Sequence, residues 1–80
     1  MVFKENVLKP IRVETYSGYK ADERPLYLVL DERRMEVLDI IDRWYGEEAD
    51  YFKVRVAGDR VYLILRDRRS SRWILEKIIH

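Results

Sequence analysis

The chain has 80 residues, which is enough for one small domain and leaves no room for a second core. It contains no cysteine, so disulfides, thiolate metal sites and thiol catalysis are excluded. Lysine and arginine (16) nearly balance aspartate and glutamate (15), and the net charge of +1 is unlike that of a dedicated nucleic-acid-binding domain. We expect a single small domain over residues 1–80 that depends on its large apolar side chains for stability.

Neither a secretion signal nor a membrane span is visible. Lys4, Glu5 and Lys9 interrupt any apolar stretch at the start of the chain. The longest apolar runs are only a few residues, far short of the ~20 that cross a bilayer. These features predict a cytoplasmic protein with no membrane partner. The many charged residues and the single amide side chain, Asn6, are typical of thermophilic proteins.

The first part of the chain contains two candidate strands. The segment IRVETYS, residues 11–17, alternates apolar and polar side chains with the period of two that is typical of a half-buried strand. Ser17, Gly18 and the polar stretch after them indicate a loop. The apolar run LYLVL predicts a second strand at about 25–31, with both faces largely covered.

The middle segment, DERRMEVLDIIDRWYG, supports two interpretations. In the first it is a helix, with Asp31 as the N-cap, one apolar stripe and Gly46 at its end. In the second, a tight turn at 31–34 leads into a long strand at about 34–45, and LDII interrupts the alternation at a β-bulge. Helix propensity favours the first interpretation by a modest margin.

The last part of the chain predicts a β-hairpin. Two β-rich runs, YFKVRV and VYLIL, flank AGDR, and a Gly-Asp turn between such runs is a hairpin signal. Its strands are expected at 51–57 and 60–66. The final segment, 72–79, fits either a strand or a short helix capped by Ser71.

A resemblance decides both open segments in favour of strands. RRMEVLDIIDRWYGEEADYFKVRVAGDRVYLILRD, followed by SSRWILEKII, is similar to an uncharacterised family of short bacterial β domains. The shared pattern covers roughly residues 25–80, with an ILDRW-like run, YFKVR, a strand that ends in RD and a closing RW-x-L. Some members are joined to Y-family-polymerase-like proteins of DNA-damage mutagenesis. The resemblance implies a small antiparallel β domain and carries no settled activity.

The expected fold is therefore mostly β, with an antiparallel meander that closes into a barrel or a strongly bent sheet. The strands are expected near 11–17, 25–31, 34–45, 51–57, 60–66 and 72–79. The alternative is an α+β fold with a helix at about 32–45. The residues expected to be largely buried are Val13, Leu28, Val37, Trp44, Phe52, Val54, Leu63, Leu65 and Trp73.

The sequence does not contain the combinations of residues that known kinds of catalytic site require. The acidic residues between 31 and 50 do not have the spacing of a calcium loop or of a catalytic carboxylate pair. The serines have no histidine available except His80, the last residue. Three scattered glycines cannot form a phosphate-binding loop. We expect no catalytic residue, no metal site and no cofactor, and hence a protein that is not an enzyme.

A local charge asymmetry indicates a binding role. Residues 31–50 hold eight acids and three bases, a charge of −5, whereas residues 51–72 hold seven bases and two acids, a charge of +5. Such asymmetry can orient a partner. The candidate binding residues are the basic Lys53, Arg55, Arg66, Arg68, Arg69 and Arg72, together with Tyr45 and Tyr51.

Two kinds of partner fit a non-enzymatic binding module of this composition. One is nucleic acid, bound weakly through its backbone by the basic residues, with the tyrosines beside them. The other is a protein, including a second copy of the chain, with the −5 segment of one surface facing the +5 segment of another.

Overall fold

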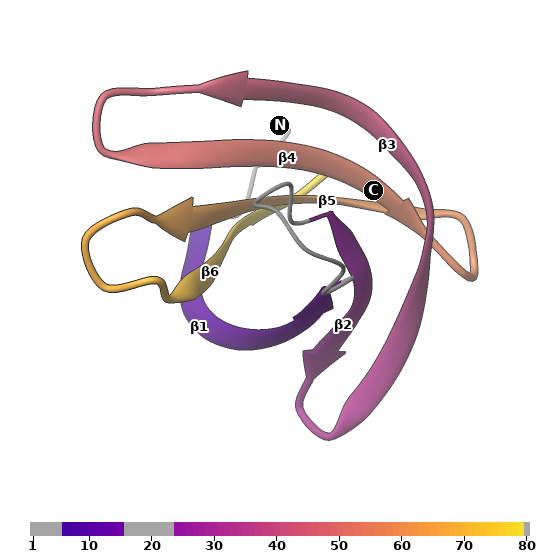
Figure 1. Cartoon of the computed structure of the whole chain (residues 1–80). Helices are drawn as coiled ribbons and strands as arrows, with labels where there is room; N and C mark the ends of the chain where they lie inside the picture. The colour runs from indigo at the N-terminus through magenta and orange to yellow at the C-terminus, as the bar shows by residue number, and fades with distance from the viewer. Residues whose placement is uncertain (1–5, 16–23, 80) are drawn as a thin grey trace.

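The computed structural model describes residues 6–15 and 24–79, which form six antiparallel strands and no helix. The strands are β1 (Asn6–Thr15), β2 (Pro25–Leu30), β3 (Arg33–Tyr45), β4 (Ala49–Val56), β5 (Arg60–Asp67) and β6 (Trp73–Ile78). Each strand pairs with the next, and β6 pairs with β1, so the meander closes into a barrel (Figure 1). The predicted all-β fold is confirmed, and the alternative helix at 32–45 is wrong. The predicted loop at Ser17 and Gly18, and His80, lie outside the described residues.

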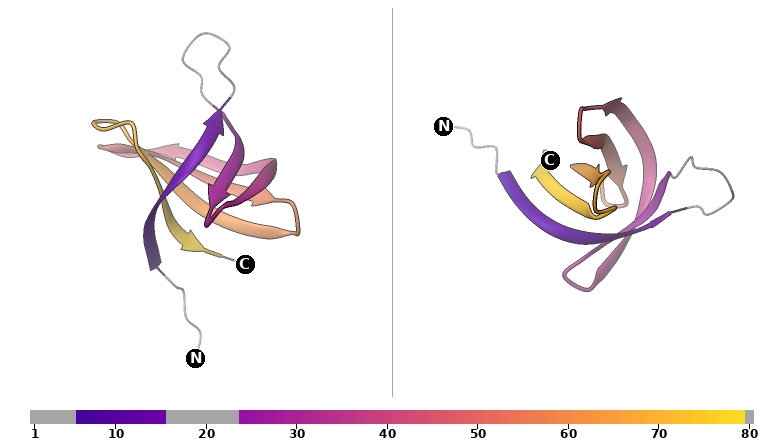
Figure 2. Two further views of the ribbon diagram at one scale, coloured as in Figure 1. Left: turned by 90° about the horizontal axis from the view of Figure 1, so that it is seen from below. Right: turned by 60° about the vertical axis from the view of Figure 1, so that its left-hand side comes forward.

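Two strands, β1 and β3, form the corners of the barrel because each changes its neighbour along its length. In β1, residues 12–15 pair with β2, whereas the preceding residues pair with β6. In β3, residues 33–36 pair with β2, whereas residues 37–45 pair with β4. The barrel therefore consists of a short sheet of β1, β2 and β3 and a longer sheet of β1, β6, β5, β4 and β3 (Figure 2).

The shape of β3 explains why its sequence looks partly helical. Its register against β4 shifts between Val37 and Asp39 and again between Ile40 and Asp42, which confirms the predicted bulge at LDII. With one extra residue in each shift, the side chains that face the buried Val56, Val54 and Phe52 recur every three residues, at Val37, Ile40 and Arg43. This spacing lies between the period of two of a regular strand and the 3.6 of a helix.

The barrel interior is filled by one cluster of buried side chains: Leu28, Phe52, Val54, Val56, Tyr62, Ile64, Trp73 and Leu75. The rings of Phe52 and Trp73 contact each other there, with centroids 5.5 Å apart. Burial of Leu28, Phe52, Val54, Leu63 and Trp73 is confirmed. The expected core residues Val13 and Val37 are half-buried and pack against the cluster from its margin.

Two of the expected core residues do not lie in the core. Trp44 is 40% exposed, and Leu65 is only half-buried. Both are register partners of Tyr51, which precedes the buried Phe52 on β4 and therefore points to the opposite, outer face. The prediction that Trp44 and Leu65 are largely buried in the core is therefore wrong.

The hairpin turns place residues in the left-handed region of backbone conformation. In the β2–β3 turn, Asp31 and Glu32 have φ values of 52° and 69°, as a two-residue type I′ turn requires. In the β4–β5 turn, Gly58 and Asp59 have φ values of 94° and 62°, and the Asp59 amide donates to the carbonyl of Val56 at 3.1 Å. The predicted tight turn and the predicted Gly-Asp hairpin turn are both present.

Candidate binding surface

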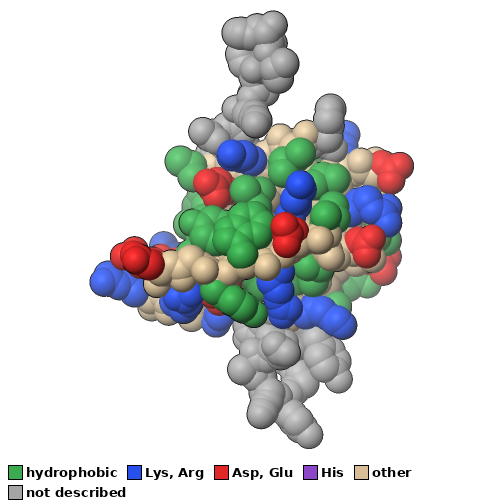
Figure 3. Space-filling model, turned by 90° about the horizontal axis from the view of Figure 1, so that it is seen from above, with side chains coloured by type: hydrophobic (Ala, Val, Ile, Leu, Met, Phe, Trp, Pro, Cys, Tyr) green, Lys and Arg blue, Asp and Glu red, His purple; other side chains and the backbone are tan. Residues whose placement is uncertain are grey.

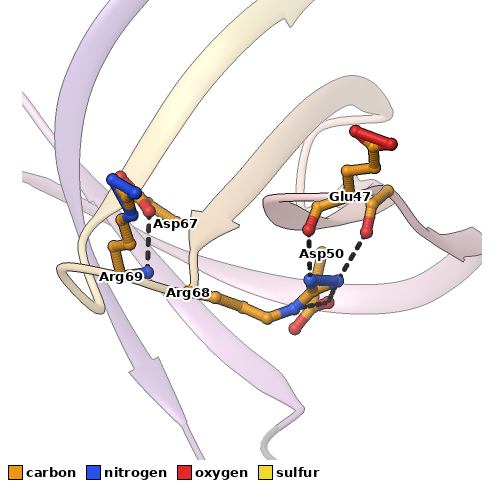
Figure 4. A network of polar contacts seen from close by, with 6 residues as sticks. Glu47, Asp50, Asp67, Arg68 and Arg69 are labelled. Carbon is orange, nitrogen blue, oxygen red and sulfur yellow. Dashed lines mark hydrogen bonds and ion pairs between the residues drawn. The ribbon is translucent and has the colours of Figure 1, made fainter.

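Arg68 connects the β3–β4 loop to the β5–β6 loop at one end of the barrel (Figure 4). Its Nη2 donates to the carbonyl of Gly46 at 2.6 Å, and its Nη1 donates to the carbonyl of Glu47 at 2.9 Å. Its Nε donates to Asp50 Oδ1 at 3.1 Å, and its backbone amide donates to the carbonyl of Glu48 at 3.1 Å. Arg68 is therefore a structural clasp between two loops, and each nitrogen of its guanidinium donates a hydrogen bond within the chain.

The β5–β6 loop is ordered by a second set of hydrogen bonds around Asp67. Its carboxylate accepts from the Arg69 amide at 2.9 Å, and its carbonyl accepts from the Ser71 amide at 2.7 Å. The hydrogen bond from the Arg69 amide, followed by those from Ser70, lowers the pKa of Asp67 below its ordinary value of 3.8. Arg69 and Arg72 are exposed on this loop.

Arg55 belongs to an ion-pair network on the outer surface. It contacts Asp39 at 3.2 Å on the neighbouring strand and Asp59 at 3.5 Å in the following turn. The pair of Arg55 with Asp39 and that of Arg68 with Asp50, at 3.1 Å, join the acidic segment 31–50 to the basic segment 51–72 within one molecule. Part of the opposite charge of the two segments is therefore paired without a partner molecule.

The two remaining basic candidates occupy different sides of the sheet. Lys53 lies on the outer face, in register with Asp42 on β3 and Leu63 on β5, and is half-buried. Arg66 alternates with outward Leu65 and so lies on the inner side, at the barrel end next to its register partner Trp73. Lys53 and Arg66 therefore do not form one track.

The two tyrosine candidates differ in how open they are. Tyr45 ends β3 and is 67% exposed. Tyr51 is half-buried, because one face of its ring stacks on Trp44 with centroids 5.3 Å apart. Gly46 lies beside the same ring, where an added Cβ would come within 3.0 Å of Tyr51 Cε1. Of these two candidates, only Tyr45 has a ring that is largely exposed to solvent.

Sequence reasoning missed an apolar row that crosses the outer face of the longer sheet. Its members are direct cross-strand partners: Trp44 with Tyr51, Tyr51 with Leu65, Leu65 with Ile74, and Ile74 with Pro10. Trp44 and Pro10 are exposed, and the others are half-buried. Part of the row could have been found from the hairpin turn, because the AGDR turn alone brings positions 51 and 65 together.

Other kinds of site are not formed by the residues that the structure describes. Among residues 6–15 and 24–79, no three potential metal-ligating side chains come together. In the same residues, no helix is long and apolar enough to span a membrane. A cavity lies where β2 and β3 separate, lined by side chains that include Pro25, Leu26 and Leu38.

In comparisons with known proteins, no family model, curated protein or solved structure matches the chain. The resemblance to the family of short bacterial β domains therefore stays a prediction.

Proposed function

We propose that this barrel is a non-enzymatic interaction module that binds a protein partner on the outer face of its longer sheet. The observation that carries the proposal is the row of Trp44, Tyr51, Leu65 and Ile74, which continues across four strands. Contiguous apolar surface on a small protein is typical of a protein-binding site. Trp and Tyr are also the residue types that most often dominate the energy of such interfaces.

The rim of the row favours a protein partner over a polyanion. On one side, Lys53 and Lys77 flank Leu63 in the next register row. On the other side lies the β3–β4 loop, which exposes Glu47 and Glu48. An apolar centre with a rim of both charges is the usual anatomy of a protein interface, whereas the acidic loop would repel a phosphate backbone.

The test uses a photo-crosslinking amino acid at position 65 or 74, incorporated in cells that produce the protein. Position 29 is the control, because Val29 is half-buried and outward-facing on the short sheet. We expect adducts of discrete mass from positions 65 and 74 and none from 29, and a Tyr51→Ala variant should reduce their yield. Adducts that form equally at position 29, or none at 65 and 74, would contradict the proposal.

A second candidate function is weak, backbone-directed binding of single-stranded nucleic acid at the loop end of the barrel. The observation that favours it is the exposure of basic and aromatic side chains at this end. Arg69 and Arg72 are exposed on the β5–β6 loop, and Tyr45, at the start of the β3–β4 loop, is 67% exposed. Arg68 holds these two loops together. Arginine forks suit phosphate, and an open tyrosine ring offers a face on which a base can stack.

A titration of single-stranded oligonucleotides at low and moderate salt tests the second candidate. Binding through phosphates should weaken steeply as salt rises, and Arg69→Glu with Arg72→Glu should abolish it. The matched control is Arg12→Glu with Arg33→Glu, which makes the same charge change at exposed positions on the short sheet. Arg68 is left intact because it holds the loops together. Equal loss in both double variants, or no binding at low salt, would rule out this candidate.

A further inference from the structure

A cavity lies at the corner of the barrel where β3 leaves β2. β3 pairs with β2 only at residues 33–36 and with β4 from Val37 on, whereas Pro25, at the start of β2, pairs with β1. Figure 1 shows β3 curving away from the start of β2. The cavity between the two strands has a volume of about 330 Å³, near the lower end of the roughly 300–1,000 Å³ that small-molecule sites occupy.

The lining of the cavity is mostly apolar, and its apolar members are Pro25, Leu26, Val37, Leu38 and Ile40. Val37 and Ile40 also pack against the buried core cluster, so they form the floor. Leu38 is 47% exposed because it is the extra residue of the first bulge in β3, and bulges redirect side chains in this way. Figure 3 shows the side of the molecule that β3 forms, where hydrophobic side chains are exposed among acidic and basic ones. An aliphatic chain in the cavity would displace water from such apolar surface.

Two charged side chains, Arg24 and Asp39, also line the cavity. Asp39 is already paired with Arg55 at 3.2 Å. Arg24 is exposed and forms no ion pair with the residues that the structure describes. The uncompensated charge in the lining is therefore positive. A guanidinium forms two parallel hydrogen bonds with a carboxylate, so Arg24 is suited to hold one.

We propose that this cavity binds a small aliphatic carboxylate, with the carboxylate on Arg24 and the chain between Leu26 and Leu38. An apolar lining with one charged group that fixes the orientation of the ligand is the usual composition of a small-molecule site. A phosphate fits less well, because it carries a charge of about −1.5 to −2 and Asp39 would oppose it. The cavity shares no residue with the apolar row of the proposed function, so the two proposals can fail separately.

A free acid fits this cavity better than the carboxyl end of a peptide. The rest of a peptide would have to continue beyond the cavity along β3, where two bulges interrupt the regular spacing that strand pairing needs. A free acid makes no such demand, because the cavity is large enough to hold it whole.

Titration of the ¹⁵N-labelled chain with hexanoate, followed through the backbone amide shifts, tests the site. We expect saturable shifts concentrated at residues 24–26 and 37–40, with a dissociation constant of about 1 mM or lower, as suits a ligand of this size. Acetate lacks the chain and hexylammonium reverses the charge, so each should bind at least about tenfold more weakly. Equal binding of either control, or no saturable shift with hexanoate below about 20 mM, would overturn the proposal.

Arg24→Gln tests the charged group. It removes the charge from an exposed position and should raise the dissociation constant of hexanoate at least about tenfold. The matched control is Arg33→Gln, because Arg33 is also exposed but does not line the cavity. It should bind hexanoate like the native chain. Equal weakening in the two variants, or none in Arg24→Gln, would contradict the assigned role of Arg24 and with it the proposal.

A second pair of variants tests the apolar lining. Leu38→Asp and Ile41→Asp place the same charge at side chains that are 47% and 48% exposed, and of the two only Leu38 lines the cavity. Leu38→Asp should abolish hexanoate binding, whereas Ile41→Asp should retain it. Circular dichroism should show the same all-β spectrum for both variants. Equal affinities for hexanoate in the two variants would rule out the cavity as the site.

N-acetylglycyl-leucine separates the free acid from a peptide end, because it carries the same carboxylate and an aliphatic side chain at the end of a short peptide. We expect it to bind the native chain no more tightly than hexanoate does, since the added peptide group finds no partner along the bulged strand. Tighter binding of this compound would make the carboxyl end of a protein the occupant and would overturn the free acid.

Discussion

Trp44 and Tyr51 stack on the outer surface of the barrel, with ring centroids 5.3 Å apart and ring planes within 3° of parallel. A second aromatic pair, Phe52 and Trp73, lies inside the barrel with centroids 5.5 Å apart and planes tilted by 44°. Tyr51 and Phe52 are consecutive on β4, so the two pairs are separated by one step of the strand alternation. The pairs are similar in chemistry but opposite in location, and they should contribute differently to stability.

Replacing Phe52 by alanine should lower the free energy of unfolding by about 3–5 kcal/mol, because the ring is fully enclosed and its loss leaves a cavity. Replacing Trp44 by alanine should lower it by only about 1 kcal/mol, the contribution of an exposed aromatic pair. Chemical denaturation of both variants checks the difference. Equal losses would place the Trp44 ring in the core.

The clasp made by Arg68 should depend on the shape of its guanidinium. Arg68→Lys keeps the positive charge but cannot reach Gly46, Glu47 and Asp50 at once. We expect a loss of about 1–2 kcal/mol in the free energy of unfolding and faster amide hydrogen exchange in the β3–β4 loop. Arg69→Lys is the matched control and should leave both quantities unchanged. Similar exchange in the two variants would mean that charge alone holds the loops.

The six strands could be predicted because most of them show a clear period or a turn signal. The hairpin of β4 and β5 follows from AGDR, whose Gly58 adopts the positive φ that glycine tolerates. β3 could not be assigned from its own pattern, since its two bulges replace the period of two by a spacing of three. The resemblance to a β family was needed to choose strand over helix there.

The candidate site was harder to predict than the fold. Alternation shows which side chains share a face, but Trp44 and Leu65 are as apolar as the residues that fill the core, so their pattern does not indicate the outer face. The sequence indicates a basic binding loop that includes Arg68, whereas the structure shows Arg68 bonded mostly to backbone carbonyls. Every residue has a backbone carbonyl, so the sequence does not show which of them accept from Arg68.

Acid should weaken the β5–β6 loop through Asp67. Because hydrogen bonds lower the pKa of Asp67 in the folded chain, the stability that its carboxylate contributes is present above its ordinary pKa of 3.8 and is lost as the pH falls through the folded value. Asp67→Asn keeps an acceptor oxygen but not the charge. It should be less stable than the native chain near neutral pH, and denaturation at successively lower pH should show the difference shrinking below about pH 4. A difference that stays constant down to strongly acidic pH would assign the effect to packing.

Glycine at one position of the β2–β3 turn should increase the stability of the fold. Glu32 has a φ of 69°, a conformation that crowds the Cβ of any residue other than glycine. Asp31, at 52°, tolerates this region better because its side chain is short and polar, and it also pairs with Lys9 at 2.7 Å. Glu32→Gly should therefore raise the free energy of unfolding by about 0.5–1 kcal/mol, after the entropy cost of glycine is subtracted.

The matched control for this turn is Glu36→Gly, which makes the same change at an exposed position inside β3. No positive φ is relieved there, so glycine should lower the free energy of unfolding by about 0.5–1 kcal/mol through its greater freedom in the unfolded chain. Thermal melts of the two variants should move in opposite directions from the native melting temperature. If Glu32→Gly also melts earlier than the native chain, the glutamate is not strained in the turn, and the type I′ geometry at Asp31 and Glu32 is wrong.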